Sequence, residues 1–392
     1  MKCKKILTAL LAAACTMSGC HGDLDIMQDN KLSASNMWID ESDAETATYG
    51  IYLYMRDALK SVHDIYLCWG EFRNGLWGAG TNKTLSGVDQ TQVRTSTMSS
   101  SNAYADWSVM YKTVNQANLI LKHVPEMGIS ESVRNFSLGN AYFSRAWCYF
   151  WIARIWGDAP LALTGYESTA GDLYLPRAPK AEIFARIESD LTEAERYVTD
   201  NSDKAVATPA AVQMLKADYA LWMYRVAGGG SSYLTMAEEA IETLNLSASR
   251  LESDYAQVFS SANKLNKEVI FAVHQANGEA VNGPGYYLGW NSNYVEAAYQ
   301  NNPVPITGGN QWWWYTDRYK ALLTSVEGDT RTKLTYNRAD YGTTIKSIEW
   351  TEKGVGQMIS GARIFDSDFI LYRYAEAFLM DAEIKYYRKD YG

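Results

Sequence analysis

The groups that most often carry out catalysis are isolated in this sequence. The four histidines, His21, His63, His123 and His274, lie far apart, and the chain has no HExxH or CxxC pattern. It also has no GxSxG nucleophile elbow, no P-loop and no GxGxxG. We therefore expect no bound metal and no cofactor.

Carboxylates are plentiful, and two pairs are close enough in sequence to consider as an acid and a base. They are Glu238 with Glu239 and Asp366 with Asp368. A glycosidase needs two carboxylates at a fixed separation around the scissile bond, which sequence spacing does not establish. Such residues are more common as solvated helix faces or helix caps. The pattern favours a binding protein over an enzyme.

Aromatic residues are the unusual feature, with 13 Trp and 28 Tyr in 392 residues. One group falls on helical apolar stripes, where we expect core packing: Trp107, Trp147, Trp151 and Trp222. A second group falls in irregular sequence: Trp69, Trp77, Tyr286, Tyr287, Trp290, Trp312, Trp313, Trp314 and Tyr315. Three adjacent tryptophans are not expected to face one core together, so at least one should be exposed or line a cleft. Exposed rings mark binding surfaces.

Sugar rings suit such a surface, because the apolar face of a pyranose lies flat on an indole while its hydroxyls need polar partners. Amide and charged side chains stand beside each aromatic patch. We expect Trp77, Trp290, Trp312, Trp313 and Trp314 to stack on sugars. The predicted hydrogen-bonding residues are Arg73, Asn74 and Asn291. The alternative is that these loops pack on the helices or on a partner protein.

The first nineteen residues are typical of a bacterial secretion signal. Three lysines precede an apolar stretch, 6–14, that is too short to span a bilayer. Residues 17–20, MSGC, resemble a lipobox, which predicts cleavage before Cys20 and acylation of that cysteine. The alternative is an ordinary secretory signal cut near Ala14 or Gly19.

Net charge and cysteine content indicate which partners to expect and what holds the fold together. The chain has 36 Lys+Arg against 45 Asp+Glu, a net charge of −9, which argues against nucleic acid as a partner. Of the five cysteines, three lie in the predicted leader or carry its lipid. We expect Cys68 and Cys148 to be free thiols, so a large hydrophobic core must hold the fold together.

Hydrophobic periodicity predicts a mainly α-helical chain, with an irregular second half that carries little β-structure. Residues 62–101 lack periodicity and are expected to form a long functional loop. Helices paired through short turns indicate a scaffold like that of tetratricopeptide (TPR) repeats, although no 34-residue period is visible. The predicted helices run from Asp40 or Ser42 to Leu59 and over 107–121, 132–156, 180–194, 209–227, 235–246, 317–326 and 366–390, and 268–273 is the predicted strand.

The predicted last helix has an apolar face of Leu371, Tyr374, Phe378, Ala382 and Tyr386. An amphipathic helix does not bury such a face alone. We therefore expect the chain to be a fragment that lacks a partner helix. The predicted organisation is a signal peptide at 1–19, a helical region at 20–226 and an incomplete C-terminal region at 227–392.

Several segments together resemble the SusD/RagB family. Residues 145–151, RAWCYFW, followed by 156–161, WGDAPL, are similar to its "RA-x-x-YF … WGD-x-PL" pattern. Residues 328–331, GDTR, and 373–383, RYAEAFLMDAE, resemble its C-terminal signatures. The resemblance implies that Arg145 and Asp158 belong to the scaffold and do not contact ligand.

The resemblance also implies a place and a role. The chain would be a lipid-anchored protein on the outer-membrane surface of a member of the Bacteroidota, with a TPR-like fold. It would capture oligosaccharides and deliver them, without catalysis, to a SusC-like TonB-dependent transporter. Three alternatives remain open: a peptide or other nutrient as the ligand, a surface glycoside hydrolase, or a structural subunit whose loops only bind the transporter.

Overall fold

The computed structural model describes residues 37–80, 87–169, 173–279, 283–309 and 311–391. The predicted signal segment 1–19 and the predicted lipidation site Cys20 lie outside the described residues. The longer helices of the protein are α2 (Glu41–Gly70), α4 (Ser108–His123), α5 (Glu131–Trp156), α6 (Lys180–Tyr197), α7 (Pro209–Arg225), α8 (Ser231–Glu242) and α12 (Tyr374–Arg388). Its shorter α-helices are α3 (Val88–Thr95), α9 (Tyr255–Val258), α10 (Asp317–Leu323) and α11 (Thr330–Thr335).

The helices begin and end where local chemistry favours it. Asp40 caps α2 by accepting a hydrogen bond from the Asp43 backbone N–H at 3.1 Å, and Asp43 accepts one from Asp40 in return. Thr208 caps α7, and Pro209 takes the first helical position. Helix α5 ends at Gly157, whose φ of +73° suits a residue without a Cβ.

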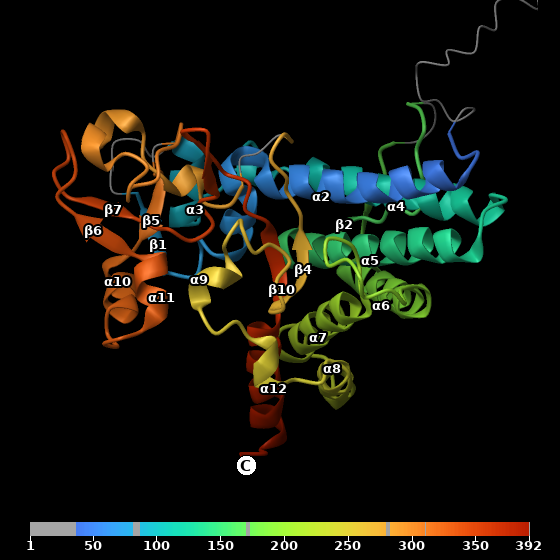
Figure 1. The fold of residues 1–392 in the computed structure, drawn as a ribbon. Helices are drawn as coiled ribbons and strands as arrows, with labels where there is room; N and C mark the ends of the chain where they lie inside the picture. Colours follow the sequence, from blue (N-terminus) through green and yellow to red (C-terminus); the bar gives the residue numbers. More distant parts are fainter. Residues whose placement is uncertain (1–36, 81–86, 170–172, 280–282, 310, 392) are drawn as a thin grey trace, which may run out of the picture. The chain divides into compact units, whose positions relative to one another are not determined.

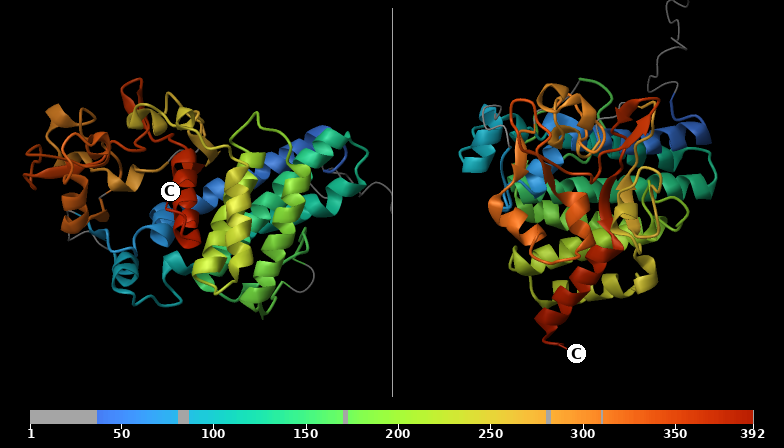
Figure 2. Two further views of the ribbon diagram at one scale, coloured as in Figure 1. Left: turned by 90° about the horizontal axis from the view of Figure 1, so that it is seen from below. Right: turned by 60° about the vertical axis from the view of Figure 1, so that its left-hand side comes forward.

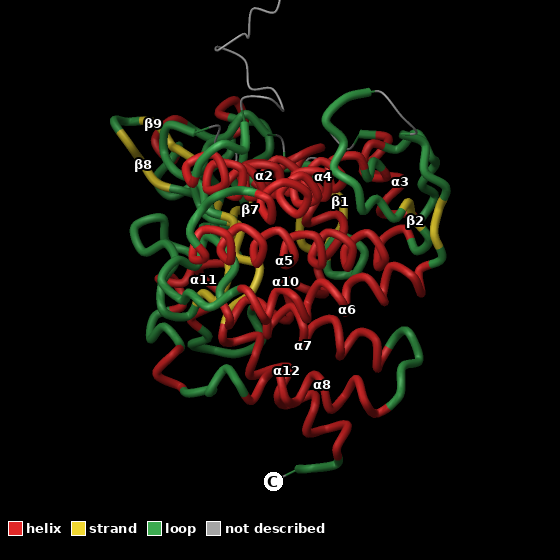
Figure 3. Tube along the Cα trace, turned by 90° about the vertical axis from the view of Figure 1, so that its right-hand side faces the viewer, coloured by secondary structure: helices red, strands yellow, loops and turns green. Residues whose placement is uncertain are grey.

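Successive helices pack against one another as a layered scaffold. Helix α5 contacts α2, α4 and α6, and α7 contacts both α6 and α8. Figure 1 shows this row on one side and the loop-rich segment around residues 300–350, coloured orange, on the other. In Figure 2 (left) the scaffold helices lie side by side, and Figure 3 shows α5, α6, α7 and α8 as consecutive layers. The prediction of a mainly helical, TPR-like scaffold is confirmed.

A buried ion pair joins three of these helices. Arg145 of α5 donates to both carboxylate oxygens of Asp190 of α6, at 2.8 and 2.7 Å, and to Asn118 Oδ1 of α4 at 2.7 Å. Asp158 Oδ1 accepts from the Lys180 backbone N–H at 2.8 Å, at the start of α6. Arg145 and Asp158 therefore act as the scaffold residues that the family resemblance implies.

The strands pair only two by two among the described residues. The antiparallel pairs are β1 (Trp77–Ala79) with β5 (Trp313–Tyr315), β2 (Ala159–Pro160) with β3 (Arg177–Ala178), β4 (Val269–Val273) with β10 (Phe369–Arg373), β6 (Asn337–Ala339) with β7 (Ile348–Trp350), and β8 (Gln357–Ile359) with β9 (Ala362–Ile364). The internal contacts divide the chain into Met1–Ile39 and Asp40–Gly392, and all these elements belong to the second unit. The predicted boundary between 226 and 227 stays a prediction.

Two predicted elements are wrong in part. The supposed loop 62–101 contains the last turns of α2, which continues to Gly70, and all of α3. The predicted helix 366–390 begins as strand β10, because Phe369–Arg373 pairs with β4, and becomes helical only at Tyr374. The predicted inner face of α12 is correct only at Tyr374. The helix buries Tyr374, Ala377, Met380 and Ile384, whereas Tyr386 is exposed.

Candidate functional site

A short antiparallel strand pair, β1 with β5, brings predicted aromatic residues of distant segments together. In the β1–β5 register Trp77 faces Tyr315, Gly78 faces Trp314 and Ala79 faces Trp313. The turn that joins α2 to β1 carries Arg73 and Asn74, both exposed. Residues 77–79 and 313–315, which belong to separate predicted aromatic patches, therefore lie side by side. Trp290 lies in a separate apolar cluster with Val295, Val304, Ile348 and Trp350.

Three of the predicted stacking residues are nevertheless buried, so the expectation that they are open to solvent is wrong. Trp313 stacks on Phe72, with ring centroids 3.8 Å apart and an interplanar angle of 18°. Trp314 is 1% exposed, and its Nε1 donates to Glu349 Oε2 at 2.7 Å. Trp290 is fully buried, and its Nε1 donates to the Glu349 backbone oxygen at 2.7 Å.

Strand geometry explains why adjacent tryptophans are buried together. Successive side chains of a strand point to opposite faces, and both faces of β5 are covered here. Phe72 covers the Trp313 side, and Glu349 of β7 receives Trp314 on the other. Only Trp312, just before the strand, is half-buried.

The predicted polar residues mainly shape turns. Asn74 Nδ2 donates to Glu71 Oε2 at 2.9 Å, and Asn74 Oδ1 accepts from the Leu76 backbone N–H at 2.8 Å. Asn291 Oδ1 accepts from the Asn293 backbone N–H at 3.1 Å. The side-chain oxygens of both asparagines are thus engaged locally.

A cavity of about 430 Å³ lies beside Trp77, at the C-terminal end of α2. Its walls come from the end of α2, segments 258–265, 284–288 and 351–354, β10 and the first turn of α12. The aromatic lining residues are Tyr66, Trp77, Trp151, Phe259, Tyr315, Tyr319 and Phe369. The charged lining residues are Glu71, Lys264, Lys353, Asp368, Arg373 and Glu376.

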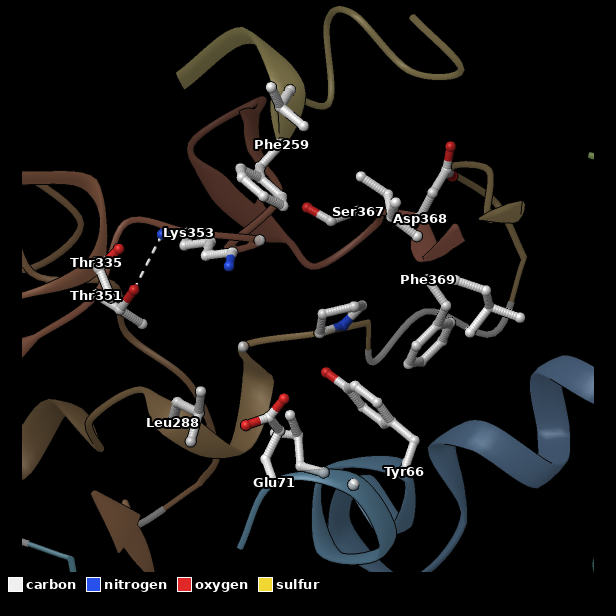
Figure 4. A pocket seen from close by; sticks show the side chains of 18 of the residues that line it. Tyr66, Glu71, Phe259, Leu288, Thr335, Thr351, Lys353, Ser367, Asp368 and Phe369 are labelled. Carbon is white, nitrogen blue, oxygen red and sulfur yellow. Dashed lines mark hydrogen bonds between the residues drawn. The ribbon is translucent and has the colours of Figure 1, made fainter. Parts of the chain in front are cut away.

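Figure 4 shows how polar groups converge on this space. Lys353 and Phe259 lie on one wall, and Glu71 and Tyr66 project from the end of α2 on the other. The side-chain ends of Lys353, Glu71 and Tyr66 point toward the open middle. The Lys353 backbone N–H donates to Thr351 Oγ1 at 3.1 Å, which fixes the segment that carries the amine. Tyr66 packs edge-on against Phe369, with centroids 5.0 Å apart.

Burial perturbs two of the charged groups. Burial lowers the pKa of Lys353 to about 8, and the positive charge of Arg373 lowers it further, against the opposing effect of Glu71. Burial raises the pKa of Glu376 to about 7, and the charge of Asp218 adds to this shift. Arg373 itself is paired, since its Nη1 donates to Glu268 Oε1 at 2.6 Å. Perturbed groups that face a cavity are typical of functional sites.

Most of these lining residues escaped the sequence analysis. Of the predicted site residues, Trp77 alone lines the cavity. Tyr66 lies inside α2, where its type and spacing resemble those of core residues. Lys353 and Arg373 meet Glu71 only through tertiary folding across about 300 residues of chain, and no local pattern signals that contact.

Two negative findings apply to the residues that the structure describes. Within the ranges from 37 to 391 given above, no group of three or more His, Cys, Asp or Glu side chains could hold a metal ion. No helix in the same ranges has the length and apolar character needed to cross a membrane. Cys68 and Cys148 are both buried and unpaired with each other.

Comparisons with known proteins find that this chain is similar to SusD-like proteins. A SusD-like family model described as "Starch-binding associating with outer membrane" matches residues 79–222. SusD-like protein P38 of Formosa agariphila is 26% identical over 190 residues, which is 48% of this chain and 36% of that protein. A SusD-like protein of Bacteroides ovatus is 26% identical over 174 residues, 43% of this chain and 32% of that protein. The matches thus span about a third of the length of these curated relatives.

Solved structures share the fold over nearly the whole chain. A SusD superfamily protein of Bacteroides fragilis has a TM-score of 0.76 and 26% identity, covering 90% of this chain and 76% of that chain. Surface glycan-binding protein A of Bacteroides thetaiotaomicron, solved with laminarihexaose, has a TM-score of 0.71 at 17% identity, covering 90% and 80% of the two chains. At that identity the second likeness concerns the fold alone.

Proposed function

Because the chain belongs to the SusD-like family, we propose that it binds oligosaccharides, with the cavity beside Trp77 as the binding site. SusD-like proteins are binding proteins, and none of the comparisons indicates a catalytic family. The family description implies an association with the outer membrane.

The cavity is the observation that carries this proposal. Its volume of about 430 Å³ falls within the range of small-molecule sites, roughly 300–1,000 Å³. Aromatic rings supply apolar faces for C–H groups, and Glu71, Lys353 and Tyr66 present polar groups to hydroxyls. A saccharide needs both kinds of contact, because a buried hydroxyl without a partner costs about 1–3 kcal/mol.

The predicted site residues take different roles in this proposal. Trp77 is the proposed stacking ring. The residues proposed to contact sugars that extend outside the cavity are Arg73, Asn74, Asn291 and Trp312. The buried indoles, Trp290, Trp313 and Trp314, are proposed to support the β1–β5 pair and the neighbouring wall.

Transport is the second part of the proposal. Captured oligosaccharide would pass to a SusC-like TonB-dependent transporter, and acylation of Cys20 would hold the protein at the cell surface. Support comes from the family and from the lipobox-like sequence before Cys20. Metabolic labelling with a fatty-acid analogue, compared with a Cys20→Ala variant, tests the anchor. Co-purification with a membrane transporter tests the partner.

Isothermal titration calorimetry with defined oligosaccharides tests the binding site. The probes are laminarihexaose, maltoheptaose and an oligogalacturonate, each titrated into the wild type and into Trp77→Ala and Tyr319→Ala variants. We expect at least one probe to bind the wild type and to bind each variant at least tenfold more weakly.

Tyr174→Ala is the matched control, because Tyr174 is 93% exposed and does not line the cavity. It should bind like the wild type. Undiminished binding by both cavity variants would contradict the assignment of this site.

A further inference from the structure

The cavity wall around Phe259 carries more positive than negative charge. Lys353 Nζ lies 4.4 Å from the Phe259 ring centroid, and Arg373 Cζ lies 5.8 Å from the same centroid. Arg373 is neutralised by Glu268, which is itself buried. None of the ion pairs between described residues includes Lys353, so one cation remains without a counter-ion on this wall.

The other charged groups around the cavity do not supply that counter-ion. Lys264 pairs with Asp366 at 3.2 Å and also donates to the Gln275 backbone oxygen. Asp368 accepts from the Gln275 backbone N–H at 3.0 Å and lies 3.0 Å from His274 Nδ1.

Three further groups lie near Lys353 or line the cavity from neighbouring elements. Burial raises the pKa of Glu376 of α12 to about 7, so it is only partly ionised at pH 7. Tyr319 of α10 lines the cavity, and the Tyr255 ring centroid of α9 lies 6.0 Å from Lys353 Nζ. Both phenols have raised pKa values, so they stay neutral.

Glu71 is the carboxylate that faces Lys353 across the cavity, and it is exposed. The two charges are not equivalent in energy. Water solvates and screens the Glu71 carboxylate, whereas burial makes the Lys353 ammonium costly to keep charged. A ligand anion that reaches Lys353 would relieve that cost, but a ligand cation at Glu71 would gain little. The cavity therefore selects for negative charge at its inner wall.

We propose that the saccharide bound here is acidic, and that a uronate carboxylate of the ligand binds between Lys353 and Arg373. This inference rests on the proposed function and gives its substrate class. The carboxylate would accept hydrogen bonds from the Lys353 amine, while the sugar face packs on the cavity rings and its hydroxyls reach Tyr66 and Glu71.

Titration of charge-matched variants tests this assignment. Oligogalacturonate and laminarihexaose are titrated into the wild type, Lys353→Met, Lys353→Arg and a control, Lys112→Met, in which an exposed lysine of α4 is replaced. We expect Lys353→Met to bind oligogalacturonate at least tenfold more weakly, and Lys353→Arg to retain most of the affinity. Lys112→Met should bind like the wild type.

A second measurement uses the wild type alone and does not depend on how the variants fold. At pH 8 the bound carboxylate should raise the pKa of Lys353, so binding should take up roughly half a proton. Calorimetry in two buffers of different ionisation enthalpy measures this uptake. Affinity for oligogalacturonate should fall several-fold between pH 7 and pH 9.5, because the amine loses its proton.

The outcomes separate this inference from the proposed function. If laminarihexaose or maltoheptaose binds in a Trp77-dependent way while oligogalacturonate does not bind, the cavity is a glycan site but the acidic class is wrong. Equal binding of oligogalacturonate to the wild type and Lys353→Met, with no proton uptake, also overturns it. If no oligosaccharide binds, the proposed function fails as well.

Discussion

Replacement of Trp314 separates support of the cavity wall from contact with ligand. The side chain is 1% exposed, and its Nε1 donates to the Glu349 carboxylate at 2.7 Å. Trp314→Ala should lower the free energy of unfolding by about 3–5 kcal/mol, as for other large buried aromatics. Trp314→Phe keeps an aromatic ring but removes the hydrogen bond to a charged group, worth about 1.5–3 kcal/mol, and leaves a small cavity in place of the larger indole.

Glu349 stays partly satisfied in the Phe variant, because Lys320 Nζ at 2.7 Å and Tyr336 Oη at 3.1 Å also contact its carboxylate. Urea unfolding monitored by circular dichroism measures both losses, and Tyr174→Ala serves as the exposed control. Under conditions where Trp314→Phe is folded, its oligosaccharide affinity should match that of the wild type. A loss below about 1 kcal/mol for Trp314→Ala, or a loss of binding in folded Trp314→Phe, would refute the role assigned to this indole.

Three further predictions concern charged groups. Arg145→Met should cost about 3–5 kcal/mol in urea unfolding, because it leaves the buried Asp190 carboxylate with only the more distant Arg186 guanidinium, at 3.6 Å. A loss below about 1 kcal/mol would contradict the scaffold role. The raised pKa of Glu376, about 7, means that its ionisation opposes folding, so wild-type stability relative to Glu376→Gln should fall as pH rises from about 4.5 through 7. A pH-independent difference between the two proteins would count against this. The raised pKa of His274, caused mainly by its contact with Asp368, gives stability that is complete below about pH 6.5 and lost above the folded-state pKa. Because His274 is exposed in part, its advantage over His274→Gln at pH 5.5 should stay below about 1 kcal/mol, and a larger advantage at pH 8.5 would show that the sign is wrong.

The helical scaffold could be predicted because its signals are local. Thr208 and Pro209 mark the start of α7, Gly157 ends α5, and apolar spacing along α4 and α6 gives the buried faces. The apolar residues of the β10 segment fit both the period of a helix and that of a strand, so the sequence alone wrongly predicts a helix there. Its pairing with β4, about 100 residues earlier, decides the outcome, and that contact leaves no mark in the local sequence.

The candidate site could be predicted only in part, for a related reason. Aromatic enrichment in irregular segments correctly indicated the part of the molecule that contains the candidate site, and Trp77 lines the cavity. Whether a given indole is exposed depends on what covers the strand that carries it. Phe72 and Glu349 cover β5 from separate parts of the chain, so Trp313 and Trp314 are buried despite their setting.

The central claim is that saccharide binds in the cavity between the end of α2 and β10. A crystal structure of the protein soaked with the tightest-binding probe tests it most directly. We predict sugar density against Trp77 and Tyr319, within hydrogen-bonding distance of Lys353. Well-defined sugar density at another surface, with the cavity free of ligand, would contradict the claim.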